Sequence, residues 1–298
     1  MQYLSSKEQL TKVGEAGLFI KKQLDPELET HCELRVALPL PNIVIICGTG
    51  LSVLANEIKN PLEIFYKDIP HCPTPTAPQH ENGKLVFGQL GEKNVVAMVG
   101  RFHCYEGYSM FEVTFLLRTL LWLGVKLVVT TNATGGINPN YKVGDIMLVR
   151  NHNSFFIPDP LIGPLFPNTV RFPDTSNLYN YHLSGIAYIS AKELGFILQQ
   201  GILVAVTGPC YENQTEIEFL KQSGCDAVGM SVIPEAKVAA SFKIPVVGFS
   251  IITNILSNSG KLNPATENEV TEEAEKVGLN LAKIIQRFLC YKDLVSPS

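Results

Sequence analysis

The stretch NIVIICGTGLS, residues Asn42 to Ser52, decides the fold class, because it runs from an unbroken apolar segment through a glycine turn into the start of a helix. Short apolar runs of this kind are typical of strands covered on both faces in α/β domains. Gly48 and Gly50 leave backbone N–H groups free at the helix start, where an anion can bind. The segment therefore predicts a strand, a tight turn and a helix, with an anion-binding turn between them.

The same alternation of strand-like and helix-like runs continues to a long final helix from about Glu267 to Leu289. We expect an α/β architecture with a largely parallel sheet, and the length of 298 residues allows one large domain or two ordinary ones. Residues 1–30 are expected to add an N-terminal helical extension, opened by the capping box Ser5-x-x-Glu8. The strand-like runs are NIVIIC, NVVAMV, KLVVTTN, DIMLVRN, ILVAVTG, DAVGM and VVGFSIITN.

Composition and charge restrict the classes of partner. The 298 residues are 46% hydrophobic and 17% charged, which predicts a globular chain with a buried core. The net charge of -4 and the scattered Lys and Arg residues argue against nucleic acid or an anionic membrane as a partner. The N-terminus lacks the pattern of a signal peptide, and Arg118 and Lys126 interrupt the most apolar later stretch. We therefore expect a cytoplasmic protein.

The chain has an odd number of cysteines, and no two of them have CxxC spacing. They therefore predict neither a disulfide framework nor a zinc site. Free, mostly buried thiols are the simpler interpretation. We expect no metal. The seven cysteines are Cys32, Cys47, Cys72, Cys104, Cys210, Cys225 and Cys290.

Polar and glycine-rich clusters follow the predicted strands. Ligands of open α/β sheets bind in the crevice at the carboxyl ends of the strands, so these clusters predict one shared pocket. The clusters are CGTGLS, GRFHCYEGY, TTNATGGINP, TGPCYEN, VGMS and TN.

The side chains in these clusters suit a phosphate-like anion beside an aromatic heterocycle. Arg101 can grip phosphate with its planar guanidinium, and His103 points to the same side of an extended chain as a second donor. Glu212 can accept from the N–H groups of a heterocycle, and Asn254 offers a donor and an acceptor. Turns, a structural histidine and a helix-capping acid are the simpler alternatives. Because no nucleophile with an obvious base is present, we expect the bound anion itself to attack.

In this order and spacing, CGTGLS, GRFHCYEGY, TNATGGINP, GPCYEN, DAVGMSVIPE and FSIITN closely resemble the trimeric purine nucleoside phosphorylases of the 6-oxopurine type. The resemblance runs from about Ile43 through the last helix. It implies a single α/β domain formed by residues 1–298, with a mixed and partly barrel-like sheet flanked by helices, in a homotrimer. It also implies a glycosyltransferase of purine salvage that converts inosine or guanosine and orthophosphate into free base and pentose 1-phosphate, without a cofactor.

The resemblance implies a set of site residues. Three of them, His103, Glu212 and Asn254, take catalytic roles, in which Asn254 stabilises the leaving base at N7 and Glu212 anchors N1–H. The phosphate-binding residues are Thr49, which stands where serine is usual, and His80, Arg101, His103, Ala133 and Ser231. The nucleoside-binding residues are Tyr105, Thr134, Gly135, Tyr211, Glu212, Val228, Gly229, Met230, Thr253, Asn254 and Glu267.

The sequence departs from the family pattern at four places. Glu267 stands where a histidine usually lies near the 5'-hydroxyl, and Thr134 replaces an alanine close to the base. The segment QHENGK has one extra residue after His80. The segment SFFIPDPLIGPLFPNTVRF is shortened, and Phe166 is the candidate for the aromatic side chain that a neighbouring subunit lends to the ribose.

Four alternatives stay open. Thr134 could supply a hydrogen bond that broadens base specificity to adenosine or to pyrimidine nucleosides such as cytidine. Methylthioadenosine phosphorylases share the early GTG turn, although Glu212 and Asn254 favour the 6-oxopurine type. A nicotinamide-dependent dehydrogenase is opposed by Val53, which stands where the dinucleotide fingerprint needs a third glycine. The last alternative is a catalytically silent nucleoside-binding protein.

Overall fold

The computed structural model describes residues 3–25, 40–77, 82–256 and 266–294. Its strands are β1 (Ile43–Cys47), β2 (Lys59–Phe65), β3 (Lys84–Leu90), β4 (Lys93–Val99), β5 (Leu127–Gly136), β6 (Ile146–Phe156), β7 (Leu198–Val206), β8 (Ala227–Gly229) and β9 (Val246–Ile255). Its α-helices are α1 (Ser6–Leu24), α2 (Val53–Asn56), α3 (Met110–Val113), α4 (Phe115–Trp122), α5 (Tyr181–Glu193), α6 (Gln214–Gln222), α7 (Ile233–Ser241) and α8 (Glu267–Leu289).

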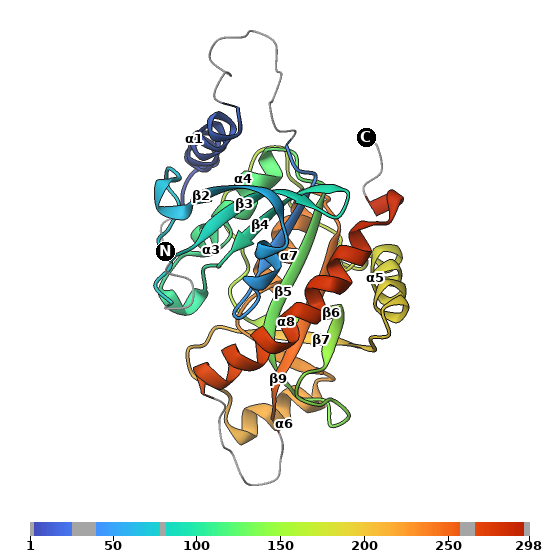
Figure 1. Ribbon diagram of the computed structural model, residues 1–298. Helices are drawn as coiled ribbons and strands as arrows, with labels where there is room; N and C mark the ends of the chain where they lie inside the picture. Colours follow the sequence, from blue (N-terminus) through green and yellow to red (C-terminus); the bar gives the residue numbers. More distant parts are fainter. Residues whose placement is uncertain (1–2, 26–39, 78–81, 257–265, 295–298) are drawn as a thin grey trace.

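The strands form a nine-stranded sheet in the order β2-β3-β4-β1-β5-β8-β7-β6-β9. Figure 1 shows β2, β3 and β4 lying together and the long helix α8 crossing one face of the sheet. Strand β5 also pairs with β9, so β5, β8, β7, β6 and β9 close into a ring. This confirms the expectation of a mixed sheet that partly closes on itself. The expectation of a largely parallel sheet is only partly right, because β2 with β3, β3 with β4, β5 with β8 and β6 with β9 pair antiparallel.

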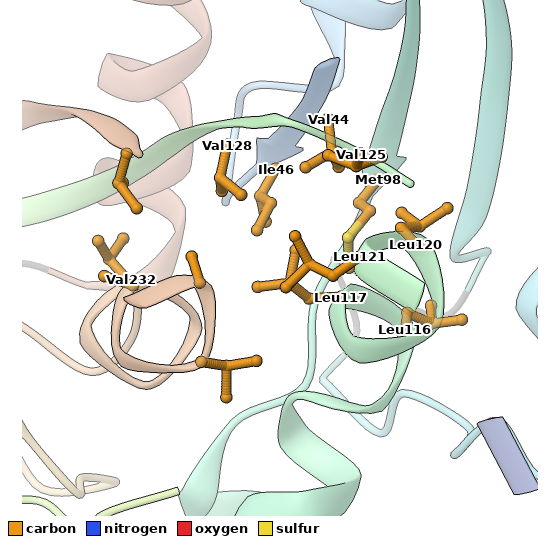
Figure 2. Packing of buried hydrophobic residues seen from close by; sticks show 14 of the residues in the cluster. Val44, Ile46, Met98, Leu116, Leu117, Leu120, Leu121, Val125, Val128 and Val232 are labelled. Carbon is orange, nitrogen blue, oxygen red and sulfur yellow. The ribbon is translucent and has the colours of Figure 1, made fainter. Parts of the chain in front are cut away.

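Both faces of the sheet are covered, as the uniformly apolar strands predicted. All five residues of β1 are buried, and successive side chains point into different clusters. Val44 and Ile46 pack on the side of α1, α4 and α7, whereas Ile43 and Ile45 pack on the side of α5 and α8. In Figure 2, Val44, Ile46, Met98 and Val128 of the sheet face Leu116, Leu117, Leu120 and Leu121 of α4.

The helix signals in the sequence act as expected at both ends of the chain. Ser5 and Glu8 form the predicted capping box, in which the Glu8 backbone N–H donates to Ser5 Oγ at 3.2 Å. Helix α8 begins at Glu267 and ends at Leu289, as predicted. The apolar run FEVTFLLRTLLWLG has the pattern of one helix but is broken at Thr114, whose hydroxyl donates back to the Met110 carbonyl at 2.7 Å.

Among the helices of the described ranges, none combines the length and the apolar composition needed to cross a bilayer.

Helix α8 packs directly on the glycine turn that follows β1. A Cβ atom on Gly50 would lie 2.6 Å from Ala274 Cβ and 2.9 Å from the Thr271 carbonyl oxygen. Gly50 also has a φ of +72°, in the left-handed region that side chains disfavour. Glycine at this position therefore lets the turn and α8 approach each other closely.

We expect Gly50→Ala to lower the free energy of unfolding by about 2–4 kcal/mol, because overpacking against α8 adds to the backbone strain. Gly195→Ala is the matched control, since Gly195 has a φ of +79° and nothing within 4 Å of an added Cβ. Urea unfolding of both variants measures the difference. Equal losses in the two variants would contradict close packing of α8 on the turn.

Candidate active site

A cavity of about 510 Å³ opens at the ends of the strands and draws lining residues from all six polar clusters. This confirms the prediction of one shared pocket. The lining residues from the clusters are Gly48, Thr49, Arg101, His103, Tyr105, Glu106, Asn132, Ala133, Thr134, Gly135, Pro209, Tyr211, Glu212, Val228, Gly229, Met230, Ser231, Thr253 and Asn254. Thr76, Ala77, Leu256, Glu267 and Val270 also line it.

Every proposed site residue within the described ranges therefore lies in this cavity. His80 falls outside the described residues. The clusters meet because β4, β1, β5 and β9 are parallel neighbours, so their carboxyl ends lie at one edge of the sheet. Strand β8 runs antiparallel to β5 and ends beside the cavity, which brings Gly229, Met230 and Ser231 to the same edge.

Arg101 is fixed at the end of the cavity beside the glycine turn. Its side chain is only 2% exposed, and Nη1 donates to Ser231 Oγ at 2.7 Å. Nη2 donates to the Thr131 carbonyl at 2.8 Å. The Thr131 hydroxyl accepts from the Gly48 N–H at 3.3 Å, so the guanidinium and the glycine turn are held by the same residue of β5. These donors converge where an anion can bind.

A buried carboxylate faces the same guanidinium from helix α7. Glu235 Oε1 lies 3.9 Å from Arg101 Nε, and both side chains are almost fully buried. Glu235 thus supplies an internal counter-charge to Arg101. Sequence reasoning gave Glu235 no role. Its position in the first turn of a helix, directly after a strand-end cluster, was the available signal, but an acid there is usually explained by the helix dipole.

His103 is oriented by Glu106. The carboxylate oxygen Oε1 of Glu106 accepts from the His103 backbone N–H at 2.7 Å and lies 3.1 Å from His103 Nδ1. Its other oxygen accepts from the Thr76 backbone N–H at 2.6 Å and from the Thr76 hydroxyl at 2.8 Å. Glu106 thus anchors the loop to Thr76, and the Tyr108 hydroxyl anchors it further by donating to the Thr74 carbonyl. Glu106 also engages one ring nitrogen of His103.

Burial by itself would raise the pKa of Glu106. Hydrogen bonds from His103 and Thr76 outweigh burial and lower that pKa to about 2. Glu106 is therefore ionised at neutral pH, and its negative charge lies against the ring of His103. Tyr105 stacks on the same ring, with centroids 4.7 Å apart and an interplanar angle of 13°.

At the other end of the cavity, an amide and a carboxylate are exposed to a ligand. The Thr253 hydroxyl lies 3.2 Å from Asn254 Oδ1 and can donate to it, which leaves Asn254 Nδ2 as a donor for the cavity. Burial raises the pKa of Glu212, and repulsion from Glu216 adds to the effect. Tyr211 lies next to Glu212 with half of its surface exposed. This end suits a heterocycle that presents both an acceptor and an N–H group.

Thr134 uses its hydroxyl within the sheet. Its Oγ1 donates to the Ile251 carbonyl at 3.1 Å, and the side chain is 3% exposed. Its methyl carbon would lie 3.2 Å from a Cβ on Gly229. With its proton engaged, the Thr134 hydroxyl can accept from a ligand but cannot donate to one.

Glu267 brings a negative charge to the side of the cavity that holds two tyrosines. Burial, then the charges of Glu106 and Glu267, raise the pKa of Tyr105. Burial, then the charges of Glu267 and Glu212, raise the pKa of Tyr211. Both phenols therefore stay protonated at neutral pH.

Phe166 is packed inside its own subunit. It is 3% exposed, its ring centroid lies 5.6 Å from that of Phe242, and the Arg118 guanidinium carbon lies 5.9 Å from the ring centroid. Phe166 therefore does not fit the role of an aromatic side chain lent to a neighbouring subunit. Within the part of the chain that the structure describes, no group of three or more His, Cys, Asp or Glu residues is placed to hold a metal ion.

Comparison with known proteins agrees with this architecture. The family sequence model described as the phosphorylase superfamily matches residues 42–289 of this chain. Purine nucleoside phosphorylase 1 of Bacillus subtilis is 42% identical over 277 residues, which cover 92% of this chain and 96% of that protein. The chain therefore belongs to the purine nucleoside phosphorylases, a family of enzymes within that superfamily, as its motifs predicted.

Two solved structures are similar over almost the whole chain. Schistosoma mansoni purine nucleoside phosphorylase in complex with adenosine has a TM-score of 0.86 and 33% sequence identity, with 97% of this chain and 100% of that chain covered. Isoform 2 from the same organism, in complex with cytosine and ribose-1-phosphate, also has a TM-score of 0.86 and 33% identity, with coverages of 98% and 99%.

The lowered pKa of Glu106 predicts a pH dependence of stability. A carboxyl whose pKa is about 2 when folded and near 4.5 when unfolded stabilises the fold above pH 4.5, and this contribution is lost as pH falls toward 2. We expect the stability difference between the wild type and Glu106→Gln to shrink between pH 6 and pH 3. Urea midpoints of both proteins measure it. A difference that does not change with pH would show that Glu106 is not preferentially ionised in the folded state.

We expect Glu235→Gln to lower the free energy of unfolding by about 3 kcal/mol, because it leaves a buried guanidinium without its counter-charge. Inorganic phosphate supplies the missing negative charge, so it should raise Tm more in Glu235→Gln than in the wild type. Glu193→Gln is the control, since Glu193 pairs with Arg287 at the surface and should matter little. Thermal unfolding with and without phosphate tests this. Similar Tm values for the two variants would count against a counter-charge role for Glu235.

Proposed function

We propose that this enzyme catalyses the phosphorolysis of purine nucleosides such as inosine and guanosine, giving free base and pentose 1-phosphate in purine salvage. One observation carries the proposal: a single cavity holds an anion corner around Arg101 at one end and the pair Asn254 and Glu212 at the other. The named purine nucleoside phosphorylases among its relatives support this substrate class.

Phosphate binds between Arg101, Ser231 and Thr49, with His103 as a further donor and the backbone of Ala133 alongside. His80 is assigned to phosphate as well. The anion lies against the sugar, so a phosphate oxygen attacks C1' as the bond from C1' to the base nitrogen breaks. The electron pair of that bond passes to the base, and positive charge that develops on the sugar is stabilised by the adjacent phosphate.

The base accepts the negative charge at the other end of the cavity. Asn254 Nδ2 donates to N7 as charge develops there, and Glu212 accepts from N1–H. The Thr253 hydroxyl beside Asn254 Oδ1 favours this orientation of the amide. The base packs against Tyr211. The remaining walls of the base site are Thr134, Gly135, Val228 and Gly229.

The sugar is assigned to the middle of the cavity. Tyr105 and Met230 contact the ribose, and Glu267 accepts from its 5'-hydroxyl. The charge of Glu267 raises the pKa of both Tyr105 and Tyr211. This supports a position for Glu267 between the sugar and the base. A carboxylate in this place accepts a hydrogen bond but, when ionised, cannot donate one.

A broader base range is a second candidate, favoured by the hydroxyl of Thr134. Because its proton is donated to Ile251, the Thr134 oxygen offers only an acceptor to the base. An acceptor suits an exocyclic amino group, which adenosine and cytidine carry and inosine lacks. Structures of two relatives contain adenosine and cytosine with ribose-1-phosphate, respectively.

We also propose that the protein is a cytoplasmic homotrimer, that residues 1–298 form one domain, and that orthophosphate is a co-substrate with no further cofactor. Two phenylalanines support association of subunits. Phe155 and Phe172 are 89% and 88% exposed, and large apolar side chains that are this exposed are often covered by a partner.

The direct test is to incubate the protein with inosine, adenosine or cytidine, with and without phosphate, and to measure the release of free base by HPLC. We expect hypoxanthine release that requires phosphate. The relative rates of base release from the three nucleosides measure the base preference. Stabilisation by nucleoside without any product would instead identify a silent binding protein.

Asn254→Ala should lower kcat/KM for inosine by about a hundredfold or more, the usual loss for one donor oriented toward developing charge. We expect a similar loss for Glu212→Ala. Asn140→Ala is the matched control, because Asn140 lies exposed outside the cavity. Steady-state kinetics at saturating phosphate compare the three variants. Values within twofold of the wild type for both Asn254→Ala and Glu212→Ala would remove the assignment of the base site.

A further inference from the structure

A buried amide in the cavity has no role in the proposed reaction. Asn132 lies on β5, is 2% exposed and lines the cavity. Its Oδ1 accepts from the Ser250 hydroxyl at 2.8 Å. Its Nδ2 finds no hydrogen-bond partner among the described residues. Because an unsatisfied buried donor is costly, an amide held in this way at a cavity wall indicates an acceptor on the ligand.

Ser250 determines which end of the amide faces the ligand. Asn132 and Ser250 are register partners on the parallel strands β5 and β9, so their side chains lie side by side. Ser250 is fully buried, and its hydroxyl donates its single hydrogen bond to Asn132 Oδ1. This hydrogen bond holds the carbonyl end of the amide toward β9 and leaves the NH2 end for the cavity.

The NH2 end lies between the two halves of the site. A Cβ on Gly229 would lie 3.0 Å from Asn132 Nδ2 and 3.2 Å from Thr134 Cγ2. Along β5, Asn132 stands between Thr131, whose carbonyl binds Arg101, and Ala133. The donor is thus placed between the anion corner and the base end, where phosphate and sugar would meet.

We propose that Asn132 Nδ2 donates a hydrogen bond to an oxygen of the substrates at the reacting centre, and that Ser250 is a positioning residue that fixes the amide for this contact. This inference rests on the proposed phosphorolysis. The acceptor is an oxygen of the bound phosphate or a sugar hydroxyl, since the base edge is assigned to Asn254 and Glu212. Glycine at 229 fits the same geometry, because a side chain there would cover the donor.

Two variants and one control test the proposal. Asn132→Asp keeps the shape and the bond from Ser250 but replaces the donor with a carboxylate. If the acceptor is phosphate, this change should lower kcat/KM for phosphate by about a hundredfold, as expected when a bond to a charged group is lost. Ser250→Ala leaves Asn132 free to turn either end of its amide toward the cavity. We expect this variant to lower kcat/KM by about three- to tenfold. Ser190→Ala is the control, because it removes an equally buried hydroxyl on α5. Its kcat/KM should stay within twofold of the wild-type value.

Comparison of inosine with 2'-deoxyinosine distinguishes the two acceptors. A loss confined to inosine identifies the 2'-hydroxyl, whereas an equal loss with both nucleosides and a raised KM for phosphate identifies phosphate. The rise in Tm on adding inorganic phosphate alone, measured by thermal unfolding, gives a readout without turnover, and it should shrink in Asn132→Asp if phosphate is the acceptor.

The proposal is overturned if both Asn132→Asp and Ser250→Ala keep kcat/KM for phosphate and for both nucleosides within twofold of the wild type. Ser250→Ala keeps the test decisive if Asn132→Asp does not fold. Failure of the proposed function looks different, because then the wild type and Ser190→Ala would release no base under any condition.

Discussion

The pairing of strand β5 is the constraint on which the site depends. Parallel pairing with β1 ends at Thr130, whereas pairing with β9 continues to Gly136. On the other side of β5, the residues between Thr130 and Gly135 pair with no described strand, because β1 pairs only as far as Thr130 and β8 only with Gly135 and Gly136. In this gap Arg101 donates to the Thr131 carbonyl instead. The guanidinium thus satisfies a backbone group at the point where the sheet opens, and the cavity begins there.

Fixed charges are arranged in the cavity before a substrate arrives. Arg101 faces Glu235 on one side and Ser231 on the other, and Glu106 holds His103. Groups held by several bonds need little reorganisation when an anion binds, so more of their interaction is available to the reaction. The same arrangement explains why a buried carboxylate lies beside Arg101, because Glu235 compensates the buried positive charge of the guanidinium.

Thr134 and Glu267, which depart from the family pattern, both line the cavity. Thr134 spends its proton on the strand beside it and offers only an acceptor to the ligand. Glu267 starts α8 and places a negative charge near two tyrosines. In the proposed assignment, the chemistry around Arg101 and the choice of substrate around Thr134 and Glu267 fall to different parts of one cavity.

The sequence by itself determined the α/β class, the start of α1, both ends of α8, and the convergence of six polar clusters, because apolar periodicity, capping residues and strand-end chemistry are local signals. It missed β2 and β3. The edge strand β2, KNPLEIF, carries polar residues and a proline that mask its pattern. Only the tertiary structure decided that Glu235 faces Arg101, that Thr134 donates to Ile251, and that Ser250 holds Asn132. Each of these contacts joins residues about 117 to 134 positions apart in the chain, and no local pattern records which distant partner a buried polar group will meet.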